Sequence, residues 1–108
     1  MKLLLDESLP RQLAAEFPAS CQVFTVPQMG WASFKNGVLL RLATEANFDA
    51  FITPDRNLER QQNLSDLKIR IVVVMAVRNR LPELIPLVAS IVQAIQTMTA
   101  GEVAHVGA

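Results

Sequence analysis

Two acidic residues, Asp6 and Asp55, stand at the ends of short apolar runs, and Glu7 lies directly beside the first. The runs cover residues 2–5 and 50–53. In an open sheet of parallel strands, ligands bind just beyond the carboxyl ends of the strands. Two parallel strands that each end in Asp would therefore bring both carboxylates to one edge. Hard divalent cations such as Mg²⁺ prefer oxygen ligands of this kind.

A plainer role is open for the same carboxylates. Asp6 and Glu7 also suit a solvated strand end beside a helix cap, and Asp55 suits the cap of a short helix. Capping by Asp55 is compatible with metal binding. The pattern by itself therefore leaves both the structural and the metal-binding interpretations open.

Three arginines, Arg56, Arg78 and Arg80, follow apolar runs on the same side of the predicted strands. Guanidinium groups bind phosphate through two parallel hydrogen bonds. Arg56 also shares a helical spacing with Arg60. The alternative is a solvated or ion-paired surface, because Glu59 is a neighbour in sequence. We expect the first three to position phosphate if the chain acts on nucleic acid.

Strand-like and helix-like segments alternate along the chain. Strands are predicted at residues 2–6, 21–26, 50–53 and 69–76, and helices at 9–17, 37–47, 56–62 and 81–98. Ser8 is the expected N-cap of the first helix, and Pro86 must sit early in the last helix or kink it. The alternation predicts one α/β domain over residues 1–108, with a mostly parallel sheet of four or five strands and helices on both faces. Residues 99–108 are expected either to add an edge strand at 102–106 or to fray.

Composition narrows the class of protein. Hydrophobic residues make up 51% of the 108 residues and charged residues 19%, which indicates a globular domain with one core. Ten basic residues balance ten acidic ones, so the charge does not indicate strong long-range attraction to nucleic acid. A near-neutral surface also makes self-association easier, so we expect a homodimer. The single cysteine, Cys21, excludes an internal disulfide and favours a reduced, cytoplasmic compartment. The sequence shows neither a signal peptide nor the run of about 20 apolar residues that spans a bilayer.

Several blocks of sequence together resemble a known family. They lie at residues 3–10, 30–32, 35–40, 53–58 and 61–64, within a match that runs from the N-terminus to about Leu87. In this combination and order they resemble the small PIN-like domain family of unknown function, which is similar to the ribonuclease toxins of toxin–antitoxin pairs. The resemblance implies a PIN-like, Rossmann-like fold, metal-dependent cleavage of RNA and an antitoxin-like protein partner.

The resemblance assigns roles position by position. Asp6 matches the first-strand Asp of PIN nucleases, and Asp55 matches an Asp in a Thr-x-Asp context. PIN nucleases have an acidic residue at the start of a middle helix, and the corresponding position in this chain is close to Val38, which cannot bind metal. A further acidic position holds Asn57, whose amide oxygen is uncharged, and Glu7 is the candidate substitute for the missing carboxylate. The family's metal site is therefore expected to be weakened or absent in this chain.

The leading hypothesis is a toxin-like, Mg²⁺- or Mn²⁺-dependent endoribonuclease. Its site residues are Asp6 and Asp55 as metal ligands and catalytic groups, Glu7 as an auxiliary catalytic residue, and Arg56, Asn57, Arg78 and Arg80 as substrate-binding residues. The second hypothesis, favoured by Val38, is a PIN-like module that has lost catalysis and binds RNA or a partner protein. The third is a structural homodimer subunit that uses the apolar face of the C-terminal helix.

The only tryptophan, Trp31, lies near Phe34 in a predicted loop. The two rings could stack a nucleobase. Isolated aromatic residues more often fill a core or an interface. We therefore expect Trp31 at a packed or dimeric surface.

Overall fold

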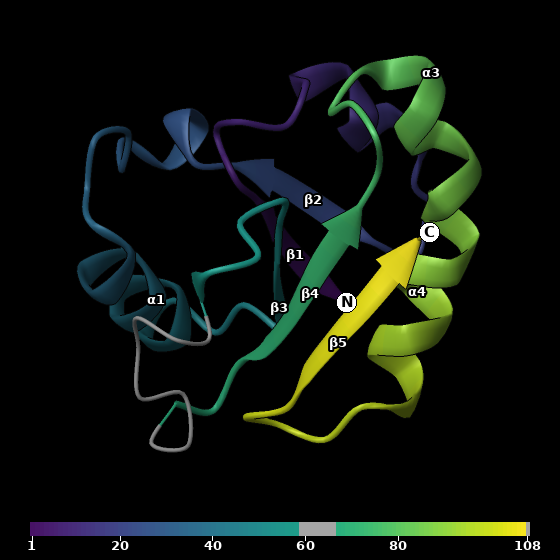
Figure 1. The fold of residues 1–108 in the computed structure, drawn as a ribbon. Helices are drawn as coiled ribbons and strands as arrows, with labels where there is room; N and C mark the ends of the chain where they lie inside the picture. Colours follow the sequence, from purple (N-terminus) through teal and green to yellow (C-terminus); the bar gives the residue numbers. More distant parts are fainter. Residues whose placement is uncertain (59–66, 108) are drawn as a thin grey trace.

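The structure is a computed structural model that describes residues 1–58 and 67–107. Its centre is a five-stranded, all-parallel sheet in the order β2-β1-β3-β4-β5 (Figure 1). The strands are β1 (Lys2–Leu5), β2 (Gln22–Thr25), β3 (Ala50–Thr53), β4 (Arg70–Met75) and β5 (Val103–Gly107). The predicted α/β class and parallel sheet are confirmed, and the C-terminal segment forms the edge strand that was one of its two expected states.

The three central strands are apolar because both faces of the sheet are covered. Successive side chains of a strand point to opposite faces, so Leu3 and Leu5 join one core cluster and Leu4 joins the other. All three are fully buried. The unbroken run of β4 divides in the same way, with Val72 on the first face and Val73 on the second.

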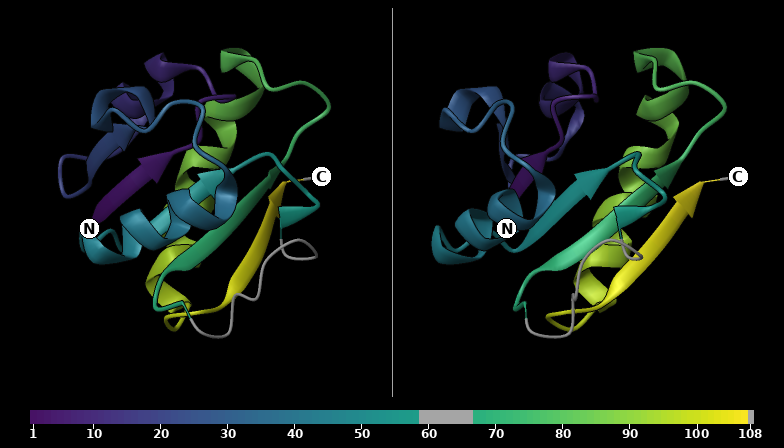
Figure 2. Two further views of the ribbon diagram at one scale, coloured as in Figure 1. Left: turned by 90° about the vertical axis from the view of Figure 1, so that its left-hand side faces the viewer. Right: turned by 60° about the vertical axis from the view of Figure 1, so that its left-hand side comes forward.

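Helical segments form a layer on each face, as Figure 2 shows. On one face lie η1 (Arg11–Glu16), α3 (Leu81–Leu84), η4 (Ile85–Leu87) and α4 (Val88–Thr97). Leu13 of η1 and Ile91 of α4 belong to the same core cluster. On the other face, α1 (Asn36–Glu45) contributes Leu40 to the second cluster, and η2 (Pro27–Met29) forms a short turn after β2.

Two predicted helices differ from expectation. The segment at 9–17 forms only the six-residue 3₁₀ helix η1, which Pro10 precedes and Pro18 follows closely. Its N-cap is Pro10, so the expectation for Ser8 was wrong. The predicted helix at 81–98 is divided into α3, η4 and α4, because Pro86 lacks a backbone N–H and its ring clashes with the preceding turn. The predicted helix at 56–62 lies mostly outside the described residues.

The turn that leads into β5 is held by side chains. Arg70 donates from Nε to the carbonyl oxygen of Met98 at 2.9 Å, and the Thr99 backbone N–H donates to Glu102 Oε1 at 2.6 Å. That backbone hydrogen bond is the main cause that lowers the pKa of Glu102, with smaller contributions from the Thr99 side chain and the charge of Arg70. The C-terminal edge strand is thereby tied to α4.

Trp31 packs edge to face on Phe48, with ring centroids 6.0 Å apart, and contacts the α1-side core. Its expected position at a packed surface is confirmed. No helix in the described part of the chain has the length and apolar character to cross a membrane.

Candidate functional site

The direction of the chain connections reverses between β1 and β3. These strands are hydrogen-bonded neighbours, with Leu5 beside Ile52. The chain leaves β1 toward β2 on one side and leaves β3 toward β4 on the other. Connections that diverge in this way open a space beyond the carboxyl ends of the two strands, where ligands bind in open α/β sheets. Asp6 directly follows β1, and Asp55 comes two residues after β3.

Asp6 continues the strand and is held on both carboxylate oxygens. Its backbone N–H donates to the carbonyl oxygen of Ile52 at 2.9 Å. Its Oδ2 accepts from the Thr53 hydroxyl at 2.6 Å, and its Oδ1 accepts from the backbone N–H and the hydroxyl of Ser8, both at 3.0 Å. Ser8 therefore orients Asp6 instead of capping η1. The side chain is half-buried, and these bonds leave one lone pair, on Oδ2, for a ligand.

Thr53 connects the two acidic residues. It is fully buried, and its hydroxyl donates to Asp6 while accepting from the backbone N–H of Asp55 at 3.1 Å. Thr53 was not among the predicted site residues. The signal was present in the Thr-x-Asp spacing, because a hydroxyl two residues before an Asp can accept from its backbone N–H.

Asp55 forms a local turn and a contact with α1. Its Oδ1 accepts from the backbone N–H of Asn57 at 2.9 Å, which is an Asx-type turn. Its Oδ2 accepts from Nδ2 of Asn36 at 3.4 Å. The side chain is half-buried. The turn-forming role is thus present, and it leaves lone pairs on both oxygens for a cation.

Asn36 is a second residue that sequence reasoning missed. It is the first residue of α1 and the member of that helix whose side chain bonds to Asp55. The resemblance placed the corresponding acidic position close to Val38, two residues later, and Val38 is 48% exposed. A helix that begins beside the carboxyl edge of the sheet directs its first side chain toward that edge, and the sequence alone did not fix where α1 begins.

Glu7 contacts a different segment from the two aspartates. It is exposed, and its Oε1 accepts a long hydrogen bond of 3.5 Å from the backbone N–H of Ser33. Within residues 1–58 and 67–107, no group of three or more His, Cys, Asp or Glu side chains is arranged to hold a metal ion. The acidic pair is therefore not extended by Glu7 as the structure stands.

The predicted phosphate-binding residues lie in the segments that leave the same edge. Arg56 and Asn57 form an exposed turn after β3, and Arg78 and Arg80 lie in the exposed segment between β4 and α3. Their role in phosphate binding stays a prediction. Arg60 lies outside the described residues.

Comparison with known proteins adds no relative: no model of a protein family, no curated protein and no solved structure matches the chain.

Proposed function

We propose that the protein is a toxin-like endoribonuclease that hydrolyses phosphodiester bonds in RNA with Mg²⁺ or Mn²⁺ as cofactor. The observation that supports this most is the chain of hydrogen bonds from Asp6 through Thr53 to Asp55 at the carboxyl ends of β1 and β3. It links the Asp6 carboxylate to the backbone N–H of Asp55 at the edge where a parallel sheet presents its ligands.

The donor set fits a weak site for a hard cation. Mg²⁺ retains several waters and needs one or two carboxylates from the protein. Asp6 and Asp55 supply two, and the Asn36 side-chain amide and the Asn57 backbone N–H contact Asp55 without adding charge. A bound divalent cation would polarise the phosphate and lower the pKa of a water.

The residues of the chain have separate tasks in this proposal. Asp6 and Asp55 hold the charge that attracts the cation, and the buried Thr53 hydroxyl links the Asp6 carboxylate to the backbone of Asp55. Arg56, Arg78 and Arg80 extend from exposed segments and would contact phosphate oxygens. Glu7 would have to leave Ser33 to act as an auxiliary group.

A second function is favoured by the neutral groups around Asp55. Where a third carboxylate would strengthen metal binding, the contacts to Asp55 come from the Asn36 side-chain amide and the Asn57 backbone N–H. Such a site suits a module that binds RNA or an antitoxin-like protein without cleaving RNA. The same residues would then serve recognition only.

Manganese titration and an RNA cleavage assay separate the two functions. Wild type and Asp6→Asn are titrated calorimetrically and incubated with a mixed RNA pool. Asp49→Asn is the matched control, because Asp49 lies at the opposite edge of the sheet, where it accepts from the backbone N–H of Lys2 at 2.7 Å. The nuclease proposal requires that wild type and the control bind manganese and cleave, and that Asp6→Asn does neither. Wild type that binds RNA but not manganese, and leaves RNA intact, would favour the binding module.

A further inference from the structure

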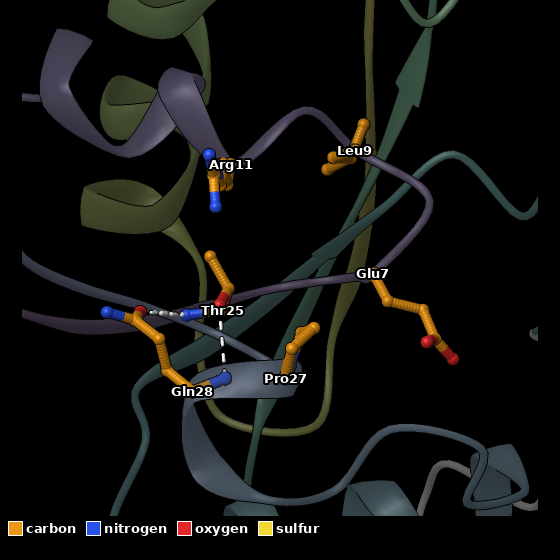
Figure 3. A pocket seen from close by; sticks show the side chains of 6 residues that line it. All are labelled: Glu7, Leu9, Arg11, Thr25, Pro27 and Gln28. Atoms are coloured by element: carbon orange, nitrogen blue, oxygen red, sulfur yellow. Dashed lines mark hydrogen bonds between the residues drawn. The ribbon is translucent and has the colours of Figure 1, made fainter.

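A pocket of about 530 Å³ lies beside the candidate site (Figure 3). The described residues that line it are Glu7, Leu9, Arg11, Thr25, Pro27 and Gln28. Its volume is within the range of pockets that bind small ligands. A smaller hollow of about 260 Å³ shares three of these residues, so the depression continues past them.

The pocket adjoins the candidate site through β1. Thr25 ends β2 and pairs with Leu5, the residue before Asp6. Leu9 lines the pocket, and its backbone N–H donates to the carbonyl oxygen of Asp6 at 3.0 Å. Neighbouring strands are about 4.8 Å apart. A linear ligand that has one group above the ends of β1 and β3 can therefore place its next group above the ends of β1 and β2.

The amide of Gln28 is oriented by the backbone. Its Oε1 accepts from the Thr25 backbone N–H at 2.8 Å, and its own backbone N–H donates to Thr25 Oγ1 at 3.3 Å (Figure 3). Because a backbone N–H can only donate, the amide oxygen must face Thr25 and Nε2 must face away. Within the described chain Nε2 has no hydrogen-bond partner, so its two donors are available to a ligand.

The other groups of the pocket complete a rim of donors around apolar walls. Figure 3 shows the Arg11 guanidinium directed from η1 toward Thr25, whereas the Glu7 carboxylate points away from both. Leu9 and Pro27 supply the apolar surface. A matching ligand carries acceptors on a flat apolar body. Guanine presents two adjacent acceptors, O6 and N7, that an arginine binds bidentately, whereas adenine pairs one acceptor with a donor.

We propose that this pocket binds a guanine base of an RNA strand that crosses the edge that holds Asp6 and Asp55. The placement of the neighbouring phosphate rests on the proposed function. The choice of base rests on Arg11 and Gln28 alone, so it can be tested without metal or cleavage.

The test is to titrate guanosine 5′-monophosphate and adenosine 5′-monophosphate into the protein in a metal-free buffer with a chelator. Binding is monitored through the NMR signals of the Gln28 side-chain amide. Wild type should bind the guanine nucleotide at least about five times more tightly, and Arg11→Met should weaken that binding about tenfold. Arg41→Met is the matched control, because Arg41 is exposed on α1 and its loss removes the same charge. It should bind as wild type does.

A further variant separates base recognition from attraction to phosphate. Arg11→Lys keeps the charge and loses the planar fork, so the guanine preference should vanish while some binding of both nucleotides remains. Guanosine without phosphate should still perturb the Gln28 amide. Equal affinity of wild type for the two nucleotides, an unaltered preference in Arg11→Lys, or no binding of either nucleotide would overturn the inference. None of these results depends on whether manganese binds or RNA is cleaved.

Discussion

The Thr53 hydroxyl donates to Asp6 Oδ2 at 2.6 Å, across 47 positions of sequence. Replacing Thr53 with Val keeps the shape of the side chain and removes this bond and the one from the Asp55 backbone N–H. A hydrogen bond to a charged group contributes about 2 kcal/mol. We expect Thr53→Val to lower the free energy of unfolding by about that amount in urea denaturation, and to weaken manganese binding.

The control for this variant is Thr44→Val. Thr44 donates to the carbonyl oxygen of Leu40 at 2.7 Å, which is a bond between neutral groups within one helix. Its loss should cost about 1 kcal/mol and leave manganese binding unchanged. Equal effects of the two variants on manganese affinity would show that Thr53 does not organise the site.

A carboxylate at position 36 should strengthen the metal site. Asn36→Asp places a third carboxylate against Asp55. Because affinity for hard cations rises with the charge of the ligands, manganese affinity should increase by about an order of magnitude. Val38→Glu adds the same charge to the same helix at an exposed position. If calorimetry finds the larger gain in Val38→Glu, position 38 lies nearer the bound cation than position 36, and Asn36 does not adjoin the cation.

Two glycines with positive φ should respond differently to alanine. A Cβ on Gly107, at φ 116°, would clash with the Met75 carbonyl oxygen, whereas a Cβ on Gly30, at φ 76°, meets no atom within 4 Å. Gly30→Ala should cost about 1 kcal/mol from backbone strain alone. Gly107→Ala should cost more and loosen the end of β5. Amide exchange in β4 and β5 is the measurement, and unchanged protection in Gly107→Ala would contradict the close contact.

The lowered pKa of Glu102 predicts how one surface contact depends on pH. A carboxyl group whose pKa is lower in the folded than in the unfolded state stabilises the fold above its ordinary value of 4.5. That contribution is lost as pH falls through the lowered pKa. Glu102→Gln should therefore have a slightly lower Tm than wild type at pH 7, and the difference should shrink in acid. Glu45→Gln, on the exposed side of α1, is the control, because it removes an equal charge and leaves the Thr99 contact in place.

Local patterns predicted the strands because both faces of the sheet are covered. Residues 50–52 and 71–75 are apolar throughout, and each run forms most of a strand at that place. The same logic placed Asp6 and Asp55 beyond neighbouring strands. The sequence did not predict the roles of Thr53 and Asn36, because these arise from contacts between segments distant in the chain. It also did not predict η1, whose short 3₁₀ form is decided by its flanking prolines and its packing on the sheet.

The all-parallel pairing of the strands has a consequence for folding. Parallel neighbours cannot be joined by a tight hairpin, so every pairing closes a long loop before its contacts form, and sheets of this kind fold slowly. The bond between Asp6 and Thr53 closes one such loop of 47 positions. A nascent chain or proteolytic fragment that ends before β3 holds Asp6 without Thr53 or Asp55. The site therefore has no precursor in the early chain and arises only when the centre of the sheet is assembled.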